Sequence, residues 1–353
     1  MLPEMIFQRE KTSVCVGTGL ITLDVVMNGH PTRPLGLWAG GSCGNVLAIL
    51  AFLGWTTLPI ARMGNDTSAT KLINDLESWG VDTSLIFQNN LVKTPVIVER
   101  LTSKADGMVR HSFQWNCPSC GSKLPRYKAI EVGDLTGKVA ERISLANVFY
   151  FDRVRKSVVE LANLNKKNGA LIVFEPSGIR DEDLYKECVK AADIVKYSSE
   201  RISNTEKLHE GIKIPLEIQT LGSQGLRYKY QNENKWFSMP SFKVCELKDP
   251  VGSGDWCTAG IIHTLGKDGK LGFSKALREN IELALKFGQA LAALNCYYEG
   301  ARGTMYSLTK QNFYQLLSLI LEGNSPAKSI CDFDNQHKVL PDPYTCPICD
   351  IIT

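Results

Sequence analysis

Short apolar segments of strand length alternate with longer amphipathic segments along most of this chain. Residues 148–151, 171–174 and 194–197 are rich in Val, Ile, Phe and Tyr, and helical patterns follow the first two at 155–168 and 181–192. Parallel strands must be joined by crossover segments, and these crossovers place helices on the faces of the sheet. The alternation therefore predicts an α/β fold with a mostly parallel central sheet flanked by helices.

A glycine-rich version of the same pattern opens the chain. Residues 13–26 read as one buried strand with Asp24 at its end, and glycines inside it are typical of a place where backbone or ligand approaches closely. The segment 40–45, Gly-Gly-Ser-Cys-Gly-Asn, then leads into apolar residues at helical spacing that continue to Gly54. We expect a glycine-rich turn that opens a helix.

One segment departs from the alternation. Residues 95–101 and 108–115 are both strand-like, and the loop between them contains Asp106-Gly107, a dipeptide typical of hairpin turns. The pattern predicts an antiparallel hairpin that does not belong to a simple parallel sheet.

Composition excludes several classes of protein. The chain has 353 residues, 44% hydrophobic and 22% charged, so a globular fold with a real core is expected. Its formal net charge is only +3, and no stretch gathers the basic residues that nucleic-acid binding requires. The longest apolar run, 46–55, is about half the length of a membrane-spanning helix, and residues 1–12 lack the apolar region of a signal peptide. These features predict a cytoplasmic protein that binds neither nucleic acid nor membranes.

The segment 249–255, Asp-Pro-Val-Gly-Ser-Gly-Asp, is the most informative motif for chemistry. Its two glycines allow a tight turn, so the amides of residues 252–255 can point together at the start of a helix, where an anion is favoured. Asp255 at the edge of this anion hole could accept a proton from a hydroxyl that attacks a bound phosphoryl group. The alternative is a capped loop in which Asp255 is only the helix N-cap.

Three motifs occur in an order that resembles the ribokinase-like carbohydrate kinases, the phosphofructokinase B family. They are Gly40-Gly41 with Asn45, Gly64-Asn65-Asp66, and the glycine loop that ends at Asp255. The resemblance covers roughly residues 13–310 and includes both family signatures. It implies a three-layer ribokinase-like fold over residues 1–340, with a small β-sheet lid formed by about 25–38 and 89–115.

The resemblance also implies a role for each matched position. Asp255 matches the catalytic base, and the anion hole matches Gly252, Ser253 and Gly254. The positions that bind the hydroxyls of the acceptor match Asp24, Gly41, Asn45 and Asp66. Those on the nucleotide side match Thr220, Gly222, Gly225 and Ala301, and Gln289 stands where the family often has an asparagine in the helix that faces the adenine. Ordinary turns at strand ends remain the alternative for the first four of these nucleotide-side positions.

Two elements of the family pattern are altered. The Asn-x-x-Glu element, which orders magnesium-bound water, has no asparagine in the segment Tyr197-Ser198-Ser199-Glu200, so Glu200 is the best remaining carboxylate. The Asp-x-Asn strand end reads Glu175-Pro176-Ser177. These changes leave the class of reaction in place and leave the handling of the metal and the exact substrate open.

Four of the eleven cysteines form two Cys-x-x-Cys pairs, Cys117 with Cys120 and Cys346 with Cys349. Together they supply the four thiolates of a tetrahedral zinc site, which has no open position for catalysis and is therefore structural. Such a site would hold the C-terminal tail, residues 341–353, beside residues 117–121. Two redox-active pairs, or reduced thiols without a metal, are the alternatives.

The sequence as a whole predicts an ATP- and magnesium-dependent kinase that phosphorylates a hydroxyl of a sugar or sugar-like molecule. A nucleoside kinase shares the same motifs, and the missing asparagine also allows a catalytically weak sensor of sugar or nucleotide. Whether the chain forms a homodimer is left open.

Overall fold

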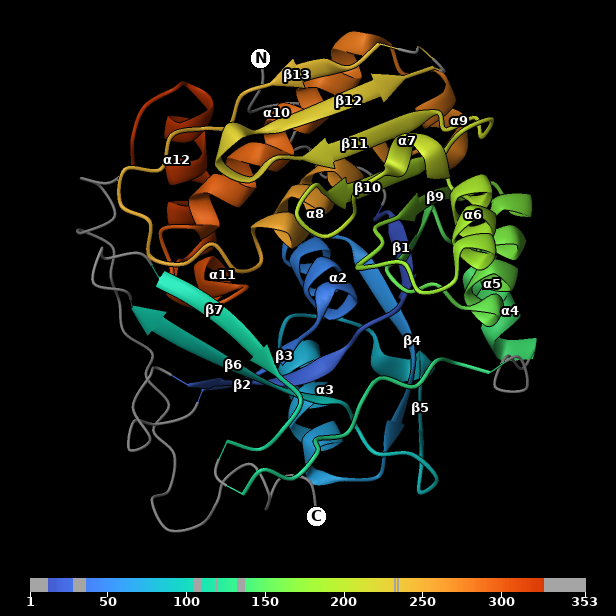
Figure 1. The fold of residues 1–353 in the computed structure, drawn as a ribbon, viewed down its shortest axis with the longest axis vertical. Coiled ribbons are helices and arrows are strands. Elements are labelled where there is room, and N and C mark those ends of the chain that lie inside the picture. Colours follow the sequence, from blue (N-terminus) through green and yellow to red (C-terminus); the bar gives the residue numbers. More distant parts are fainter. Residues whose placement is uncertain are drawn as a thin grey trace.

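The computed structural model describes residues 12–27, 36–103, 109–118, 120–131, 137–231, 233 and 235–326 (Figure 1). The expected tail at 341–353, with Cys346 and Cys349, lies outside the described residues, as does the middle of the segment 25–38. Within the described parts of the chain, no helix combines the length and apolar character needed to cross a membrane.

A nine-stranded sheet forms the centre of the fold. Its strands are β1 (Val14–Thr18), β4 (Thr56–Gly64), β5 (Ile86–Asn89), β8 (Val148–Phe151), β9 (Leu171–Phe174), β10 (Ile194–Ser198), β11 (Leu216–Thr220), β12 (Leu226–Tyr230) and β13 (Phe237–Met239). Their order is β13-β12-β11-β10-β9-β8-β1-β4-β5, parallel from β11 to β5 and antiparallel where β12 and β13 join the edge. The expectation of a mostly parallel sheet is confirmed.

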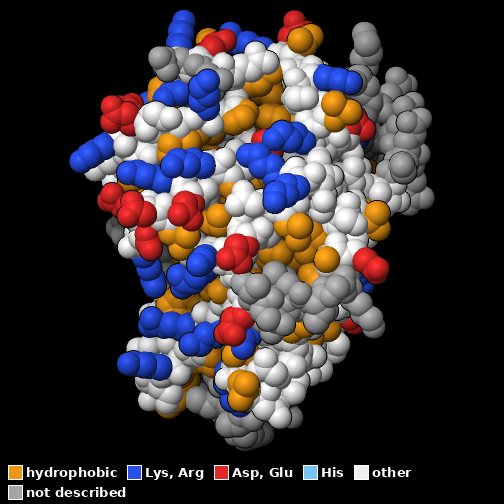
Figure 2. Space-filling model, turned by 90° about the vertical axis from the view of Figure 1, so that its right-hand side faces the viewer, with side chains coloured by type: hydrophobic (Ala, Val, Ile, Leu, Met, Phe, Trp, Pro, Cys, Tyr) orange, Lys and Arg blue, Asp and Glu red, His pale blue; other side chains and the backbone are white. Residues whose placement is uncertain are grey.

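Helices cover both faces of this sheet because both faces of its strands are apolar (Figure 1). One layer contains α2 (Ser42–Phe52), α8 (Ser253–Leu265), α10 (Arg278–Asn295) and α12 (Lys310–Leu321). The other contains α4 (Gly137–Ile143), α5 (Lys156–Lys167) and α6 (Glu182–Ala191). Neighbouring strand residues alternate between the layers, since Cys15 packs in the first core and Val16 in the second. The solvent side of the second layer carries basic side chains interspersed with acidic and apolar ones (Figure 2).

A second, four-stranded sheet has the order β3-β2-β6-β7. It is built from β2 (Thr22–Met27), β3 (Gly36–Gly40), β6 (Val96–Ser103) and β7 (Val109–Gln114). The expected hairpin is confirmed as the antiparallel pair β6 and β7. Helix α3 (Thr67–Ser78) buries Leu72 and Leu76 in the core that also holds Val25 and Val98 of this sheet. The small sheet is thus joined to the body through α3.

The prediction of one continuous strand over residues 13–26 is wrong. The chain leaves the large sheet at Thr18 and enters the small sheet at Thr22. A side chain at Gly19 would place its Cβ 1.8 Å from Oδ1 of Asp152, and the same oxygen accepts a hydrogen bond from Leu20 N at 2.9 Å. The strand is broken because Asp152 holds this turn, which hydrophobic pattern alone cannot reveal.

Five short helices complete the described fold, namely α7 (Thr205–Leu208), α9 (Gly269–Ser274), α11 (Gly303–Ser307) and the 3-10 turns at Thr83–Leu85 and Gly222–Gln224. The carboxyl ends of the parallel strands meet at one edge of the large sheet, where ligands of such folds bind. At this edge Glu175 follows β9, and Thr258 in the second turn of α8 donates a hydrogen bond to it. The candidate site is therefore at this edge.

Candidate active site

The glycine loop turns directly into α8. Gly252 is the N-cap residue, with φ of 76° in the left-handed region, and a Cβ there would lie 2.1 Å from the carbonyl oxygen of Ala301. Glycine is required on both counts. Ser253, Gly254 and Asp255 are the first three residues of the helix, so the interpretation of Asp255 as N-cap is wrong. Ser253 N donates to Pro250 O at 3.2 Å, whereas the amides of Gly254 and Asp255 have no backbone partner among the described residues and point out of the start of the helix, as an anion hole requires.

Two buried side chains, Asp249 and Asn295, fix the shape of the loop. Asp249 accepts hydrogen bonds from Val251 N at 2.8 Å and from Gly300 N at 2.7 Å. Asn295 donates from Nδ2 to the carbonyl oxygens of Val251, Gly300 and Ala301, at 3.1, 3.2 and 3.3 Å. Neither residue belongs to the predicted set. The anion-hole loop is therefore held to the 300–301 loop by a closed set of hydrogen bonds.

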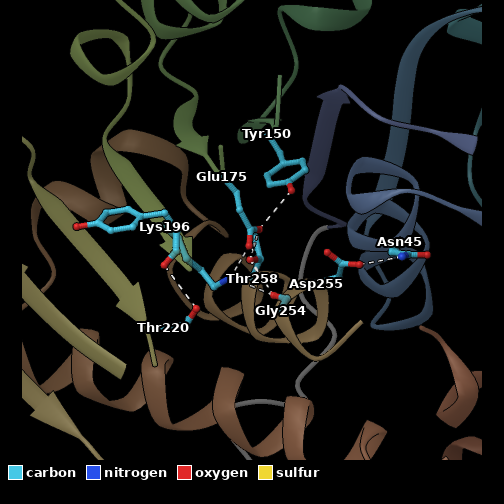
Figure 3. Close-up of polar contacts among 9 residues, drawn as sticks. Asn45, Tyr150, Glu175, Lys196, Thr220, Gly254, Asp255 and Thr258 are labelled. Carbon is cyan, nitrogen blue, oxygen red and sulfur yellow. Dashed lines mark hydrogen bonds and ion pairs between the residues drawn. The ribbon is translucent and has the colours of Figure 1, made fainter. Parts of the chain in front are cut away.

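Asp255 is paired with Asn45 across the site, since Asn45 Nδ2 donates to Asp255 Oδ2 at 2.8 Å (Figure 3). Burial, together with the nearby negative charge of Glu175, raises the pKa of Asp255 to about 7. The Asn45 hydrogen bond and the positive charges of Arg201 and Lys196 act in the opposite direction. A carboxylate with a pKa near 7 suits a general base at neutral pH. Arg201, near this carboxylate, was not predicted.

Asp24, Gly41 and Asn45 form one continuous arrangement at the start of α2. Asp24 accepts a hydrogen bond from Thr22 Oγ1 and one from the amide of Gly41. Gly41 is the N-cap of α2 with φ of 78°, and Asn45 N donates to Gly41 O at 2.9 Å. Burial raises the pKa of Asp24 to about 7, with a smaller contribution from the negative charge of Glu99. The structure thus links Asp24 to Asp255 through Gly41 and Asn45.

Asp66 has a different set of contacts. Its Oδ1 accepts from Ala69 N at 2.9 Å as the N-cap of α3, and its Oδ2 accepts from Thr94 N at 2.9 Å. Both carboxylate oxygens are therefore engaged by backbone amides. This geometry favours a structural role that fixes the end of β4 and the segment before β6.

The residues predicted for the nucleotide side fall into two groups. Thr220 is the last residue of β11 and Gly222 lies in the turn after it. Ser199 N donates to Thr220 O at 3.0 Å, which brings the exposed Glu200 beside this turn. Gly225, with φ of 99°, closes the turn against Met239 O, where a Cβ would be 2.2 Å away. Ala301 instead packs on Gly252, and Gln289 is buried in α10, where its Nε2 has no hydrogen-bond partner among the described residues.

A buried polar network lies directly behind the first turn of α8 (Figure 3). Lys196 forms an ion pair with Glu175 and donates to Gly254 O at 3.2 Å. Glu175 also accepts hydrogen bonds from Thr258 Oγ1 at 2.5 Å and Tyr150 Oη at 3.3 Å. The network was missed because β10 reads as an ordinary buried strand. The signal was present, since a lysine within a buried strand is rare unless it is paired.

The carboxylates at this edge do not form a complete metal cage. Among the described residues, no group of three or more His, Cys, Asp or Glu side chains gathers as metal ligands. Mg²⁺ keeps several waters and commonly takes one or two carboxylates together with substrate phosphates, so such a cage is not needed. Glu175 is committed to Lys196 and Thr258, whereas Glu200 is exposed beside the Thr220 turn. The donor set is compatible with a magnesium ion held largely by nucleotide phosphates.

The first cysteine pair lies on a tight turn after β7. Gly121 N donates to Cys117 O at 2.8 Å, and Gly121 has φ of 76°. Cys117 is buried and Cys120 is exposed. The second pair, Cys346 and Cys349, is outside the described residues, so the four-cysteine site stays a prediction.

Comparison with known proteins identifies the family. Residues 138–307, which include β8 to β13 and the anion-hole loop, match the pfkB family of carbohydrate kinases. The chain contains a pfkB-family carbohydrate kinase domain. The kinase is 26% identical over 289 residues to a fructokinase of Escherichia coli, covering 74% of this chain and 90% of that one. It is 25% identical over 290 residues to a fructokinase of Zea mays, covering 74% and 80%.

Solved structures agree on the fold of the kinase. Fructokinase from Xylella fastidiosa with bound ATP superposes with a TM-score of 0.66 at 19% identity, covering 90% of this chain and 98% of that one. Ribokinase from Arabidopsis thaliana in complex with ribose and ATP gives 0.63 at 17% identity, covering 92% and 99%. The predicted ribokinase-like fold and the predicted enzyme class, a phosphotransferase with an alcohol group as acceptor, are confirmed.

Proposed function

We propose that this kinase transfers the γ-phosphoryl group of ATP to a hydroxyl group of a sugar or sugar-like molecule. The observation that carries the proposal is the position of Asp255, in the first turn of α8 behind Gly252 and hydrogen-bonded to Asn45 at 2.8 Å. A base and an anion hole on one helical turn are what phosphoryl transfer to an alcohol needs.

In this mechanism Asp255 accepts the proton of the acceptor hydroxyl as its oxygen attacks. The amides at the start of α8, chiefly those of Gly254 and Asp255, stabilise the negative charge of the transferred group, supported by the positive end of the α8 dipole. Asn45 orients the Asp255 carboxylate toward the acceptor. These groups are preorganised because Asp249 and Asn295 already fix the loop.

The acceptor would lie between α2 and the small sheet. Asp24 can accept hydrogen bonds from the hydroxyls of the acceptor, and Asn45 can both donate and accept them. This combination suits a polyol. The small sheet, which carries Asp24, would act as a lid that excludes water, the competing phosphoryl acceptor. Asp66 would support this pocket by fixing the chain at the end of β4.

ATP would lie along the other side of α8. Thr220, Gly222 and Gly225 form the turn beside its phosphates, and Ala301 and Gln289 border the base. The ATP-bound state of the Xylella fructokinase supports this use of the fold. Magnesium, when bound, would neutralise the charge of the nucleotide phosphates, with Glu200 positioned to hold one of its waters.

Direct turnover measurements test the proposal. The full chain is incubated with ATP, magnesium and a panel of ketoses, aldoses, sugar acids and nucleosides, and ADP formation is followed. ADP formation dependent on a sugar supports the proposed function. ADP formation dependent only on nucleosides would assign a nucleoside kinase, and saturable sugar binding without turnover would assign a sensor.

We also propose that Cys117, Cys120, Cys346 and Cys349 bind one structural zinc ion. The tight turn at Gly121 supports this idea, because its backbone presents the two cysteines of the first pair on one short loop. A four-thiolate site has no open position, so the metal would stabilise the chain without taking part in the reaction.

A further inference from the structure

Lys196 is an almost fully buried cation in the middle of the fold. It belongs to β10, its side chain is 2% exposed, and its ε-ammonium pairs with Glu175. Removing a lysine from water is costly, so such residues are retained only where a partner compensates the charge. With so little exposure, Lys196 cannot reach a ligand directly. Its effect must pass through the groups that it contacts.

The second contact of Lys196 is a backbone carbonyl of the anion-hole helix. Lys196 Nζ donates to Gly254 O at 3.2 Å (Figure 3). This carbonyl and the amide N–H of Asp255 belong to the same peptide unit. In a trans peptide the C=O and N–H groups point in opposite directions, and in a helix the N–H points toward the N-terminus. Lys196 therefore lies behind the peptide whose N–H faces the anion hole.

We propose that Lys196 is a positioning residue of the anion hole, which holds and polarises the Gly254–Asp255 peptide from behind so that its N–H donates to the transferred phosphoryl group. This inference rests on the proposed function. The positive charge on the carbonyl side strengthens the amide as a donor. It also adds a fixed positive potential where negative charge develops, in a site that excludes water.

The surroundings of Lys196 are arranged to keep the ammonium in place. Glu175 is held from two other sides by Thr258 Oγ1 and Tyr150 Oη, so its carboxylate has little freedom to move. Thr258 Oγ1 also lies 3.1 Å from Gly254 O, but its single hydrogen is shared with the shorter bond to Glu175. The ammonium of Lys196 is therefore the stronger donor to the Gly254 carbonyl.

Lys196 and Glu175 also act in opposite directions on Asp255. The pKa of Asp255 is raised by the charge of Glu175 and lowered by that of Lys196. Removing Lys196 alone leaves the negative charge of Glu175 uncompensated, so the pKa of Asp255 should rise. Removing both charges should leave the pKa of Asp255 close to its value in the wild type. A residue with only a packing role would not shift the ionisation of Asp255 in this pattern.

The experiment compares Lys196→Met, the double variant Lys196→Met with Glu175→Gln, and Lys166→Met in the full-length enzyme. Lys166 is the matched control. Its Nζ also donates to a backbone carbonyl, Ala191 O at 2.8 Å, but Lys166 belongs to α5 and its carbonyl partner to α6, both outside the candidate site. The double variant leaves no unpaired buried charge, which protects the test if Lys196→Met fails to fold. Steady-state kinetics against pH and the binding of ADP, with and without aluminium fluoride as a phosphoryl mimic, are measured.

We expect the double variant to keep the KM for ATP and the affinity for ADP, and to lower kcat by about a hundredfold. The extra affinity that aluminium fluoride gives to ADP should fall by a similar factor. Lys196→Met should in addition move the acidic limb of the pH profile to higher pH. Lys166→Met should match the wild type in kcat, in the effect of aluminium fluoride on ADP affinity and in the pH profile.

Two results would overturn the inference. A folded double variant with wild-type kcat and an undiminished effect of aluminium fluoride would remove Lys196 from the anion hole. Parallel losses in ADP affinity and thermal stability, with an unchanged pH profile in Lys196→Met, would assign a merely structural role. A wild-type enzyme without turnover and without tighter ADP binding in aluminium fluoride would instead overturn the proposed function, and the role of Lys196 with it.

Discussion

Asn45 and Asp255 are 210 residues apart in the sequence, yet Asn45 Nδ2 donates to Asp255 Oδ2 at 2.8 Å. Asn45 is in the first turn of α2 and Asp255 in the first turn of α8, so the hydrogen bond joins the starts of two helices that pack against each other. The two glycine-rich motifs therefore form one physical unit. In the proposed function, the acceptor side and the phosphate side of the site would meet at this bond.

Replacing Asp255 with Asn tests the base directly. The variant keeps the size of the side chain and removes its proton-accepting capacity, so kcat should fall by roughly 10²- to 10⁴-fold with little change in nucleotide affinity. Asp183→Asn is the control, because Asp183 is also an acidic residue in the first turn of a helix, α6, and is exposed. Turnover near the wild-type level in folded Asp255→Asn would show that another group takes the proton.

The pH dependence follows from the buried position of Asp255. Since burial raises its pKa to about 7 and the base must be deprotonated, kcat/KM should decline as pH falls through about 7. Stability should change in the opposite sense. A carboxyl whose folded pKa is raised stabilises the fold at low pH, and this contribution is lost as pH rises from about 4 to about 7.

Thermal melts of wild type and Asp255→Asn between pH 5 and 8 isolate this contribution, because the other titrating groups are common to both proteins. The asparagine variant should lose less stability than the wild type as pH rises. Parallel curves would mean that Asp255 is ionised normally in the fold.

Asp24 should act on the acceptor alone. Asp24→Ala removes the carboxylate beside Gly41, so the KM for the acceptor should rise at least tenfold or activity should disappear, while ATP affinity stays within about twofold. Calorimetric titration with a non-hydrolysable ATP analogue separates the two effects. Equal loss of nucleotide binding would mean that the acceptor and nucleotide ends of the site have been exchanged.

Asn295 should couple stability to catalysis. Asn295→Ala leaves three carbonyl oxygens without their shared donor, so it should cost about 1–3 kcal/mol of unfolding free energy and lower kcat as the anion-hole loop loosens. Asn165→Ala is a matched control, since Asn165 is also fully buried and donates to a carbonyl, Leu161 O, in α5. If both variants lose stability while only Asn295→Ala loses kcat, the loop contacts are functional.

Zinc content is checked by elemental analysis of protein purified without chelators. About one zinc per chain is expected, and Cys117→Ser should abolish it and lower thermal stability. Cys245→Ser, at an exposed cysteine outside both pairs, should leave the metal bound. Metal-free wild-type protein with all four thiols open to titration would contradict the site.

The local hydrophobic pattern predicted the strands and helices of this fold well where burial in one layer sets that pattern. Strands β8 and β9 have the predicted limits, because each is a short apolar run between polar turns. Helix α12 was not predicted, although its apolar face packs in the first core. The break between β1 and β2 was also missed, since it depends on a carboxylate, Asp152, that is distant in sequence.

The residues of the candidate site also separate into those that the sequence predicted and those that it did not. Asp255, Gly252 and Asn45 belong to local glycine motifs and Asp24 matches the family pattern, so all four were predicted, and the structure links Asp24 to Asp255 through Gly41 and Asn45. Lys196, Glu175 and Asn295 act through partners on other strands and loops, so their roles appear only when the chain is folded. The sequence signals that the buried Lys196 needs a partner, but it does not say which residue that partner is.

The crossing from the large sheet to the small one has a mechanical consequence. Leu20 is held on both sides of its peptide, since its N donates to Asp152 and its O accepts from Cys43 N at 3.1 Å and Gly44 N at 3.3 Å. Any tilt of the small sheet must therefore turn about a nearly stationary point. Asp24 is only a few residues beyond this point and would therefore move little, whereas the edge strand β7 is farther from it and would move more. Large excursions of that edge would leave the carboxylate almost where it was.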